Sequence, residues 1–135
     1  MTLVRSVALL VGLALLAGCS TRPKGEEAPE YALLQEVNDL LHSAAGAAGR
    51  PPAKLADLDR YQSMYPQGYA AVKSGDVVVL WGAPVKGEGE ASKDDPVVAY
   101  EKAVPTDGGF VLLSGGKVKK MTAAEFSAAP KAGKK

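Results

Sequence analysis

The chain has one cysteine among its 135 residues, Cys19, which directly follows an apolar stretch near the N-terminus. One cysteine cannot form a disulfide within the chain and cannot supply the several thiolates of a structural zinc site. Aromatic residues make up 6% of the sequence, which indicates a modest hydrophobic core. The folded part of this small chain must therefore be stabilised by packing alone.

Residues 1–18 have the three parts of a secretory signal peptide. Arg5 is the only charged side chain before an apolar run over residues 7–16, and the small residues Ala17 and Gly18 follow that run. The run is shorter than the roughly 20 residues that a helix needs to span a bilayer comfortably. The sequence therefore predicts a signal peptide over residues 1–18 and an extracytoplasmic location for the rest.

The end of this segment, Leu16-Ala17-Gly18-Cys19, resembles the lipobox of bacterial lipoproteins. The resemblance implies cleavage between Gly18 and Cys19 and a diacylglycerol on the Cys19 thiol, often with a further acyl chain such as palmitate on the new amine. This covalent lipid is the only cofactor-like group that we expect, and two or three acyl chains anchor a protein stably. Ser20 stands where an Asp tends to retain Gram-negative lipoproteins at the inner membrane, which indicates the outer membrane or the periplasmic face. The alternatives are an ordinary cleaved signal, or a plain membrane helix with a chance cysteine.

Charge and composition divide the remaining chain into a tether, one domain and a tail. Without residues 1–18, 15 basic side chains face 15 acidic ones, so nothing indicates a nucleic-acid partner. Residues 19–28 are polar with Pro and Gly, which predicts a tether. Residues 29–129 are expected to form one small domain, and residues 130–135 a disordered basic tail.

Three helices are expected in the first half of the domain. Apolar residues at three- and four-residue spacing predict an amphipathic helix from Pro29 to Ala45 or Ala48; they are Leu33, Leu34, Val37, Leu40, Leu41 and Ala44. A short helix is expected over residues 52–61. Another is expected over residues 66–73, where a strand over residues 69–73 is the alternative.

The second half is expected to supply about four antiparallel strands. Residues 77–81 form a continuous apolar run, which predicts a central strand covered on both faces. After an exposed, mobile loop over residues 86–95, further strands are predicted at residues 97–102, 110–113 and 117–121. Lysines that alternate with Val118 and Met121 indicate that the last is an edge strand with one wet face. Thr122 and Glu125 have the spacing of a capping box, which predicts a helix from Ala123 that ends before Pro130. The predicted fold class is α+β, with the helices packed on the sheet.

Few side chains carry a pattern that points to chemistry. His42 is the only histidine and has no Cys or acidic cluster nearby, so a structural or surface role is favoured over a metal ligand or a general base. Asp57 and Asp59 are two residues apart and do not share a helix face. Asp94 and Asp95 lie in the predicted loop, where solvation is favoured over cation binding. We therefore expect no catalytic residue and no metal site.

Aromatic residues offer one candidate binding patch. Tyr65, Tyr69, Trp81 and Tyr100, with Tyr61 near them, could gather at the edge of the sheet as a platform for a small ligand or peptide. The competing interpretation, which we favour, places these rings in the core and rim of a small domain.

The order of elements from Pro96 to Phe126 resembles the C-terminal sheet of pilin-like and pseudopilin-like proteins, including the prepilin-type proteins of planctomycetes. Gly108-Gly109, the strand around Val118 and the Thr-x-x-Glu-Phe helix carry this resemblance. In that family the apolar strand ends in a His-x9-Asp-Gly motif; here Pro105 and Gly115 replace the His and Asp, and Gly116 is retained. The resemblance implies a helix packed on an antiparallel sheet.

Together these features predict a non-catalytic, membrane-anchored envelope lipoprotein with a structural or protein-interaction role. Its partners would be the membrane, through the lipid, and an envelope protein that the sequence does not identify. The alternative is a lipoprotein that binds a small ligand or peptide through the aromatic patch around Trp81.

Overall fold

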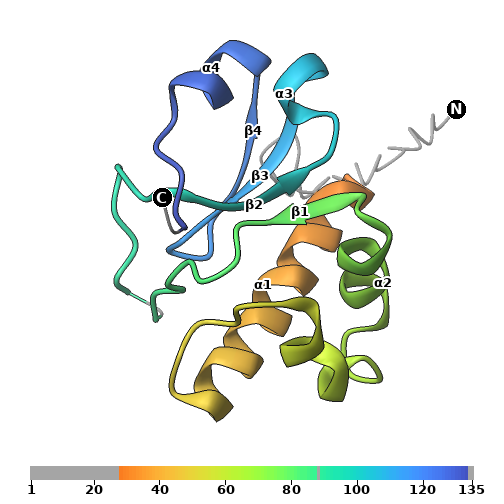
Figure 1. Cartoon of the computed structure of the whole chain (residues 1–135). Helices are drawn as coiled ribbons and strands as arrows, with labels where there is room; N and C mark the ends of the chain where they lie inside the picture. Colours follow the sequence, from red (N-terminus) through yellow and green to blue (C-terminus); the bar gives the residue numbers. More distant parts are fainter. Residues whose placement is uncertain (1–27, 88, 134–135) are drawn as a thin grey trace, which may run out of the picture.

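The computed structural model describes residues 28–87 and 89–133, so the predicted signal peptide and nearly all of the tether lie outside the described residues. The chain forms an α+β fold with one four-stranded antiparallel sheet, as predicted (Figure 1). Its elements in chain order are α1 (Pro29–Ala48), the 3₁₀-helix η1 (Leu55–Tyr61), α2 (Pro66–Ser74), β1 (Val77–Val79), β2 (Val97–Glu101), α3 (Val104–Asp107), β3 (Gly109–Leu113), β4 (Val118–Met121) and α4 (Ala123–Ala128).

Helix α1 forms where its apolar spacing predicts. Pro29 occupies its first turn, where the missing N–H is harmless, and Gly49 ends it in the left-handed conformation at φ 64°. One side is buried against the rest of the domain, through Leu34, Val37, Leu40, Leu41 and Ala44. Burial of one such aliphatic side chain contributes about 1.5–3 kcal/mol, so this face stabilises the helix far more than local propensity does.

Elements η1 and α2 pack beside α1. Residues 66–74 form a helix, so the helix predicted for residues 66–73 is confirmed and the alternative strand is excluded. Gly68 lets α2 approach α1 closely, because a Cβ at this position would lie 3.2 Å from the backbone nitrogen of Val37. The helix predicted over residues 52–61 is present as the shorter η1.

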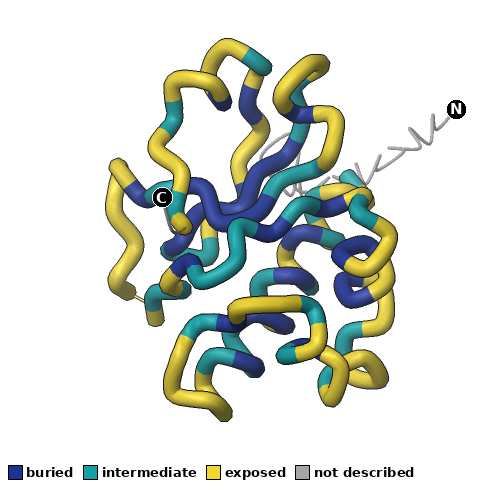
Figure 2. The backbone as a smooth tube through the Cα atoms, viewed as in Figure 1, coloured by how far each residue is buried: buried dark blue, intermediate teal, exposed yellow. Residues whose placement is uncertain are grey.

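The sheet has the order β1-β2-β3-β4, and helices cover both of its faces. Helices α1 and α2 lie on one side, and α3 and α4 lie on the other (Figure 1). Ala99, Leu112 and Val118 belong to the core under α1, whereas Val97, Val111, Leu113 and Met121 form a second cluster with Phe126 of α4. The buried stretches in Figure 2 accordingly run through the sheet and the inner turns of α1 and α2.

The prediction of a central strand at residues 77–81 is wrong. β1 covers only Val77–Val79 and is an edge of the sheet. Val77 and Val79 are buried under α1 and α2, while Val78 on the opposite face is half-buried. Leu80 and Trp81 follow the end of β1 and are apolar because they also pack against the core.

β4 is an edge strand, as predicted, but it does not have one wet face and one dry face. Val118 and Lys120 share the α1 side, and Lys119 and Met121 share the α4 side. Each face therefore has one buried apolar side chain and one exposed lysine. The reason is that α4 covers the second face of the sheet at Met121.

Helix α4 begins with the predicted capping box. The Thr122 Oγ1 accepts a hydrogen bond from the Glu125 N–H, and the Glu125 carboxylate accepts one from the Thr122 N–H at 2.8 Å. These bonds hold the pKa of Glu125 below its usual range.

The prediction of a disordered tail from residue 130 is wrong for residues 130–132, which pair with Val97 of β2. The Val97 N–H donates to the Pro130 carbonyl, and the Ala132 N–H donates to the Val97 carbonyl. The Lys131 ammonium donates to the Phe126 carbonyl and lies 4.5 Å from the centre of the Phe126 ring. A shift of register in β2 between Val97 and Ala99 leaves the Val97 backbone groups available for this pairing.

Candidate functional site

The four rings of the predicted aromatic patch do not come together. Tyr65 and Trp81 are half-buried against the core on the α1 side, where Tyr69 is buried. Tyr100 lies on the opposite face of the sheet, with its ring centre 4.7 Å from that of Phe126. The Tyr65 hydroxyl is 2.9 Å from the Ser43 hydroxyl, and the Tyr69 hydroxyl donates to Asp59 at 2.7 Å. These rings thus take part in packing on two sides of the molecule.

Among the described residues, His42 contacts a backbone carbonyl and no carboxylate. Its Nε2 lies 2.9 Å from the carbonyl oxygen of Lys86. Because a carbonyl oxygen can only accept, Nε2 donates this hydrogen bond. Within the described part of the chain, the buried Nδ1 has no partner. The ring therefore links α1 to the segment that follows β1.

Asp95 is not a solvated loop residue, which corrects the sequence interpretation. Its side chain is 1% exposed, and its Oδ1 lies 2.5 Å from the Lys86 ammonium nitrogen. The Ser92 backbone N–H and hydroxyl also donate to the carboxylate. The bonds from Lys86 and Ser92 lower the pKa of Asp95 from 3.8 to about 2. We call Lys86, Ser92 and Asp95 the loop clamp.

The loop clamp contacts the β3–β4 turn. The Lys86 N–H donates to the Ser114 carbonyl, and Ser114 is buried. Gly115 lies directly under the carboxylate of Asp95, so a Cβ there would overlap Asp95 Oδ2. Gly116 serves the turn itself, with φ 84°. Residues 86–95 thus form a loop whose two ends are fixed to the domain and whose described residues between them are largely exposed.

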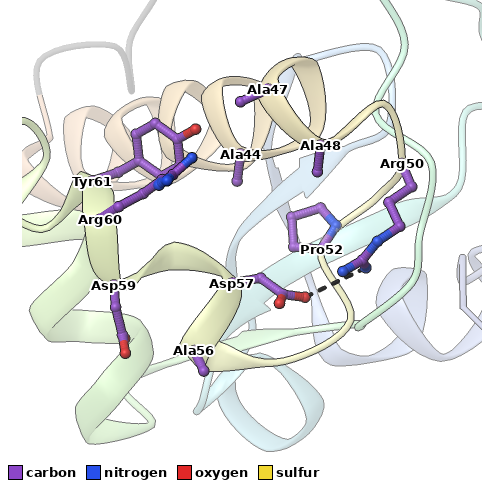
Figure 3. A pocket seen from close by; sticks show the side chains of 10 residues that line it. All are labelled: Ala44, Ala47, Ala48, Arg50, Pro52, Ala56, Asp57, Asp59, Arg60 and Tyr61. Carbon is purple, nitrogen blue, oxygen red and sulfur yellow. Dashed lines mark ion pairs between the residues drawn. The ribbon is translucent and has the colours of Figure 1, made fainter.

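A concavity with several polar groups lies between the C-terminal half of α1 and η1 (Figure 3). We call it the α1–η1 pocket. Its volume is about 360 Å³, within the range of small-ligand sites. Its small and apolar lining residues are Ala44, Ala47, Ala48, Pro52 and Ala56. Its charged and aromatic lining residues are Arg50, Asp57, Asp59, Arg60 and Tyr61.

Both aspartates of the pocket already have partners. Asp57 Oδ2 accepts the Ala53 N–H at 2.8 Å and lies 3.6 Å from Arg50 Nη1. The Ala53 N–H, helped by the Arg50 guanidinium, holds the pKa of Asp57 below its usual range. Asp59 points away from the other side chains in Figure 3 and accepts the Tyr69 hydroxyl, which raises the pKa of that phenol.

Arg60 is the second arginine that lines the α1–η1 pocket. No carboxylate in residues 28–87 or 89–133 forms an ion pair with it. Its guanidinium lies beside the Tyr61 ring at the α1 side of the pocket (Figure 3). Asp59 likewise has no ion pair in the described residues, so the two arginines and two aspartates of the pocket sum to zero charge.

Sequence reasoning did not find this pocket. The available signal was the run of small residues that ends α1, followed by Arg50-Pro51-Pro52, because small side chains leave space beside the next helix. The predicted lipidation residue Cys19 and its neighbour Gly18 lie outside the described residues.

In residues 28–87 and 89–133, no group of three or more His, Cys, Asp or Glu side chains could hold a metal ion. Among the same residues, no helix combines the length and apolarity needed to span a membrane. No family model, curated protein or solved structure matches the chain. The resemblances to lipoproteins and to pilin-like proteins stay predictions.

Proposed function

We propose that this chain is a lipoprotein anchored through Cys19, whose extracytoplasmic domain acts by binding or by structural support and not by catalysis. The observation that carries the proposal is the Leu16-Ala17-Gly18-Cys19 motif at the end of the apolar run. A short polar segment then leads to α1, which begins at Pro29. This order is typical of a lipid anchor followed by a tethered domain.

The position of α1 orients the domain in this proposal. Ten residues, Cys19 to Ala28, can extend over at most about 35 Å. They join the domain at the first turn of α1, and the 20 residues of that helix extend for about 30 Å. The α1–η1 pocket is lined by the C-terminal end of α1, at Ala44, Ala47 and Ala48, so in this proposal it lies at the end of the helix opposite the tether.

The contacts of the titratable side chains favour an interaction role over catalysis. His42 donates to a backbone carbonyl, and Asp95 is used in the loop clamp. Asp57 and Asp59 bind a backbone N–H and a tyrosine hydroxyl. General acid–base catalysis needs a group that can exchange its proton with a substrate, and these groups are engaged within the fold.

Substitution of Cys19 tests the anchor. In Cys19→Ser, we expect loss of radiolabelled palmitate from the protein and its release from the membrane fraction, because serine cannot form the thioether to the lipid. The matched control is Ser20→Ala, which keeps the motif and should keep both label and membrane attachment. Unchanged labelling and fractionation of Cys19→Ser would contradict the proposal.

Site-specific photo-crosslinking in intact cells tests the interaction role. A photoreactive residue at position 47, in the α1–η1 pocket, is compared with one at position 119, on the far edge of the sheet. We expect a discrete adduct from position 47 that is absent from position 119. If neither position gives an adduct, binding by this end of the domain is refuted.

A further inference from the structure

Three buried polar atoms between α1 and the sheet have no hydrogen-bond partner among the described residues. They are Oδ1 of Asn38, Nδ1 of His42 and Oγ of Ser114. Buried polar atoms in folded proteins are nearly always hydrogen-bonded, either to protein groups or to ordered water. A buried atom without a partner gives up its bonds to solvent on folding and receives none in exchange. The three atoms together therefore indicate a site for a small polar ligand.

The fold brings the three side chains to one interface, between α1 and the β3–β4 turn. Asn38 and His42 are four residues apart on α1, so they lie on the same flank of the helix. A Cβ at Gly116, in the turn, would lie 3.4 Å from Oδ1 of Asn38. Nε2 of His42 lies 2.9 Å from the Lys86 carbonyl oxygen, and the Lys86 N–H donates to the Ser114 carbonyl.

The Ser114 side chain lies on the α1 side of the sheet. Leu112 of β3 belongs to the core under α1, whereas Leu113 belongs to the cluster under α4. The pairing of β3 with β2 continues one residue further, because the Ser114 N–H donates to the Pro96 carbonyl. Side chains alternate between the two faces along such a strand, so the Ser114 hydroxyl is directed towards α1.

The hydrogen-bonding capacity of the three groups matches a water molecule. Nε2 of His42 donates to a carbonyl, so Nδ1 of the neutral ring is an acceptor, and Oδ1 of Asn38 is also an acceptor. The Ser114 hydroxyl can donate. Water supplies two donors for the two acceptors and accepts from the hydroxyl. Buried waters in folded proteins typically make about three hydrogen bonds of this kind.

The surroundings disfavour an ion and a larger ligand. With His42 neutral, all three groups are uncharged, so a bound cation would have no compensating negative charge, and the nearby Asp95 is already paired with Lys86. An anion would face two acceptors. Ser114 is 1% exposed, so its hydroxyl is not available to a substrate in solution.

We propose that an ordered water molecule binds between α1 and the β3–β4 turn. It donates to Oδ1 of Asn38 and Nδ1 of His42, and it accepts a hydrogen bond from the Ser114 hydroxyl. This water joins the middle of α1 to the turn that the loop clamp contacts. The inference goes beyond the proposed function and does not depend on the lipid anchor, since it concerns only residues of the described domain.

Water–protein NMR of the untagged full chain in detergent micelles tests the site directly. His42 is the only histidine, so its ring signals are unique. We expect a cross-peak between water and Hε1, the ring proton beside Nδ1, with opposite signs in the NOE and ROE spectra, as a long-lived bound water gives. Equal signs, which rapidly exchanging surface water gives, or the absence of a cross-peak would overturn the proposal.

A double-mutant cycle tests whether Asn38 and Ser114 share one water. Ser114→Ala should raise the equilibrium constant for unfolding about fivefold, as expected for the loss of one hydrogen bond. Asn38→Leu removes an acceptor of the same water. Once Ser114→Ala has weakened the binding of the water, the further effect of Asn38→Leu should be smaller by at least about threefold than its effect on the wild type.

Ser43→Ala provides the matched control for this cycle. Ser43 also lies on α1, but its hydroxyl is 2.9 Å from the Tyr65 hydroxyl and has no part in the proposed site. The effects of Ser43→Ala and Ser114→Ala on the unfolding constant should therefore multiply. If the effects of Asn38→Leu and Ser114→Ala multiply as well, the two side chains do not share a water and the proposal is refuted.

Discussion

Replacement of Gly115 by alanine is predicted to open the loop clamp. The methyl group would overlap the Asp95 carboxylate and lie 2.8 Å from the Ala91 Cα. Gly115 does not have a positive φ, so the alanine backbone is unstrained and the whole cost arises from this overlap. Insertion of a methylene-sized group into a well-packed site costs about 1–3 kcal/mol, and we expect a loss of unfolding free energy in this range.

Gly116→Ala provides a matched control one residue away. Its φ of 84° makes alanine unfavourable by about 1–2 kcal/mol, whereas its Cβ would lie 3.4 Å from the nearest atom, Oδ1 of the Asn38 side chain. The two variants should therefore lose similar stability for different reasons. Only Gly115→Ala should displace Asp95.

Urea denaturation measures the stability of both variants, and NMR distinguishes their effects on the clamp. In Gly115→Ala, the pKa of Asp95 should rise from about 2 towards 3.8, and the amide protons of Lys86 and Ser92 should exchange faster. In Gly116→Ala, both properties should stay as in the wild type. The reasoning is refuted if Gly115→Ala keeps the low pKa and the slow exchange.

Two further predictions concern acid stability and the start of α4. The pKa of Asp95 is lowered on folding, so its ionised form stabilises the protein above about pH 4, and this contribution is lost as the pH falls through about 2. Wild type should therefore lose stability between pH 4 and pH 2 relative to Asp95→Asn in acid-dependent urea denaturation, and parallel curves would contradict the prediction. Thr122→Ala removes the side-chain half of the capping box and should cost about 1 kcal/mol, measured by urea denaturation. An unchanged midpoint would show that the cap does not stabilise α4.

Local features of the fold could be predicted because neighbours in the sequence determine them. The apolar spacing from Leu34 to Ala44 defines the buried face of α1, and the choice between a helix and a strand at residues 66–73 depends on local propensity. Thr122 and Glu125 are three residues apart, so their reciprocal hydrogen bonds form within one turn. Such contacts need no information about the rest of the chain.

The candidate site could not be predicted in the same way, because its parts are distant in the sequence. Arg60 and Ala44 line one pocket only because η1 returns beside α1 after the turn at Pro51-Pro52. Tyr100 and Trp81 are candidates for one aromatic patch by residue type alone, yet the sheet separates Tyr100 from the cluster against which Trp81 packs. Composition cannot show that Asp57 forms an ion pair with Arg50 while Asp59 accepts a hydrogen bond from Tyr69.

The sequence by itself determined the class of fold, the ends of α1 and α2, the capping box of α4 and the expectation of a lipid on Cys19, because each depends on a short run of residues. Only the tertiary structure decided that β1 lies at an edge, that Asp95 is buried against Lys86, and that Arg60 faces an alanine-lined pocket. The physical reason is that strand order, burial and charge pairing arise from contacts between distant segments, and these exist only once the sheet has assembled between α1 and α4.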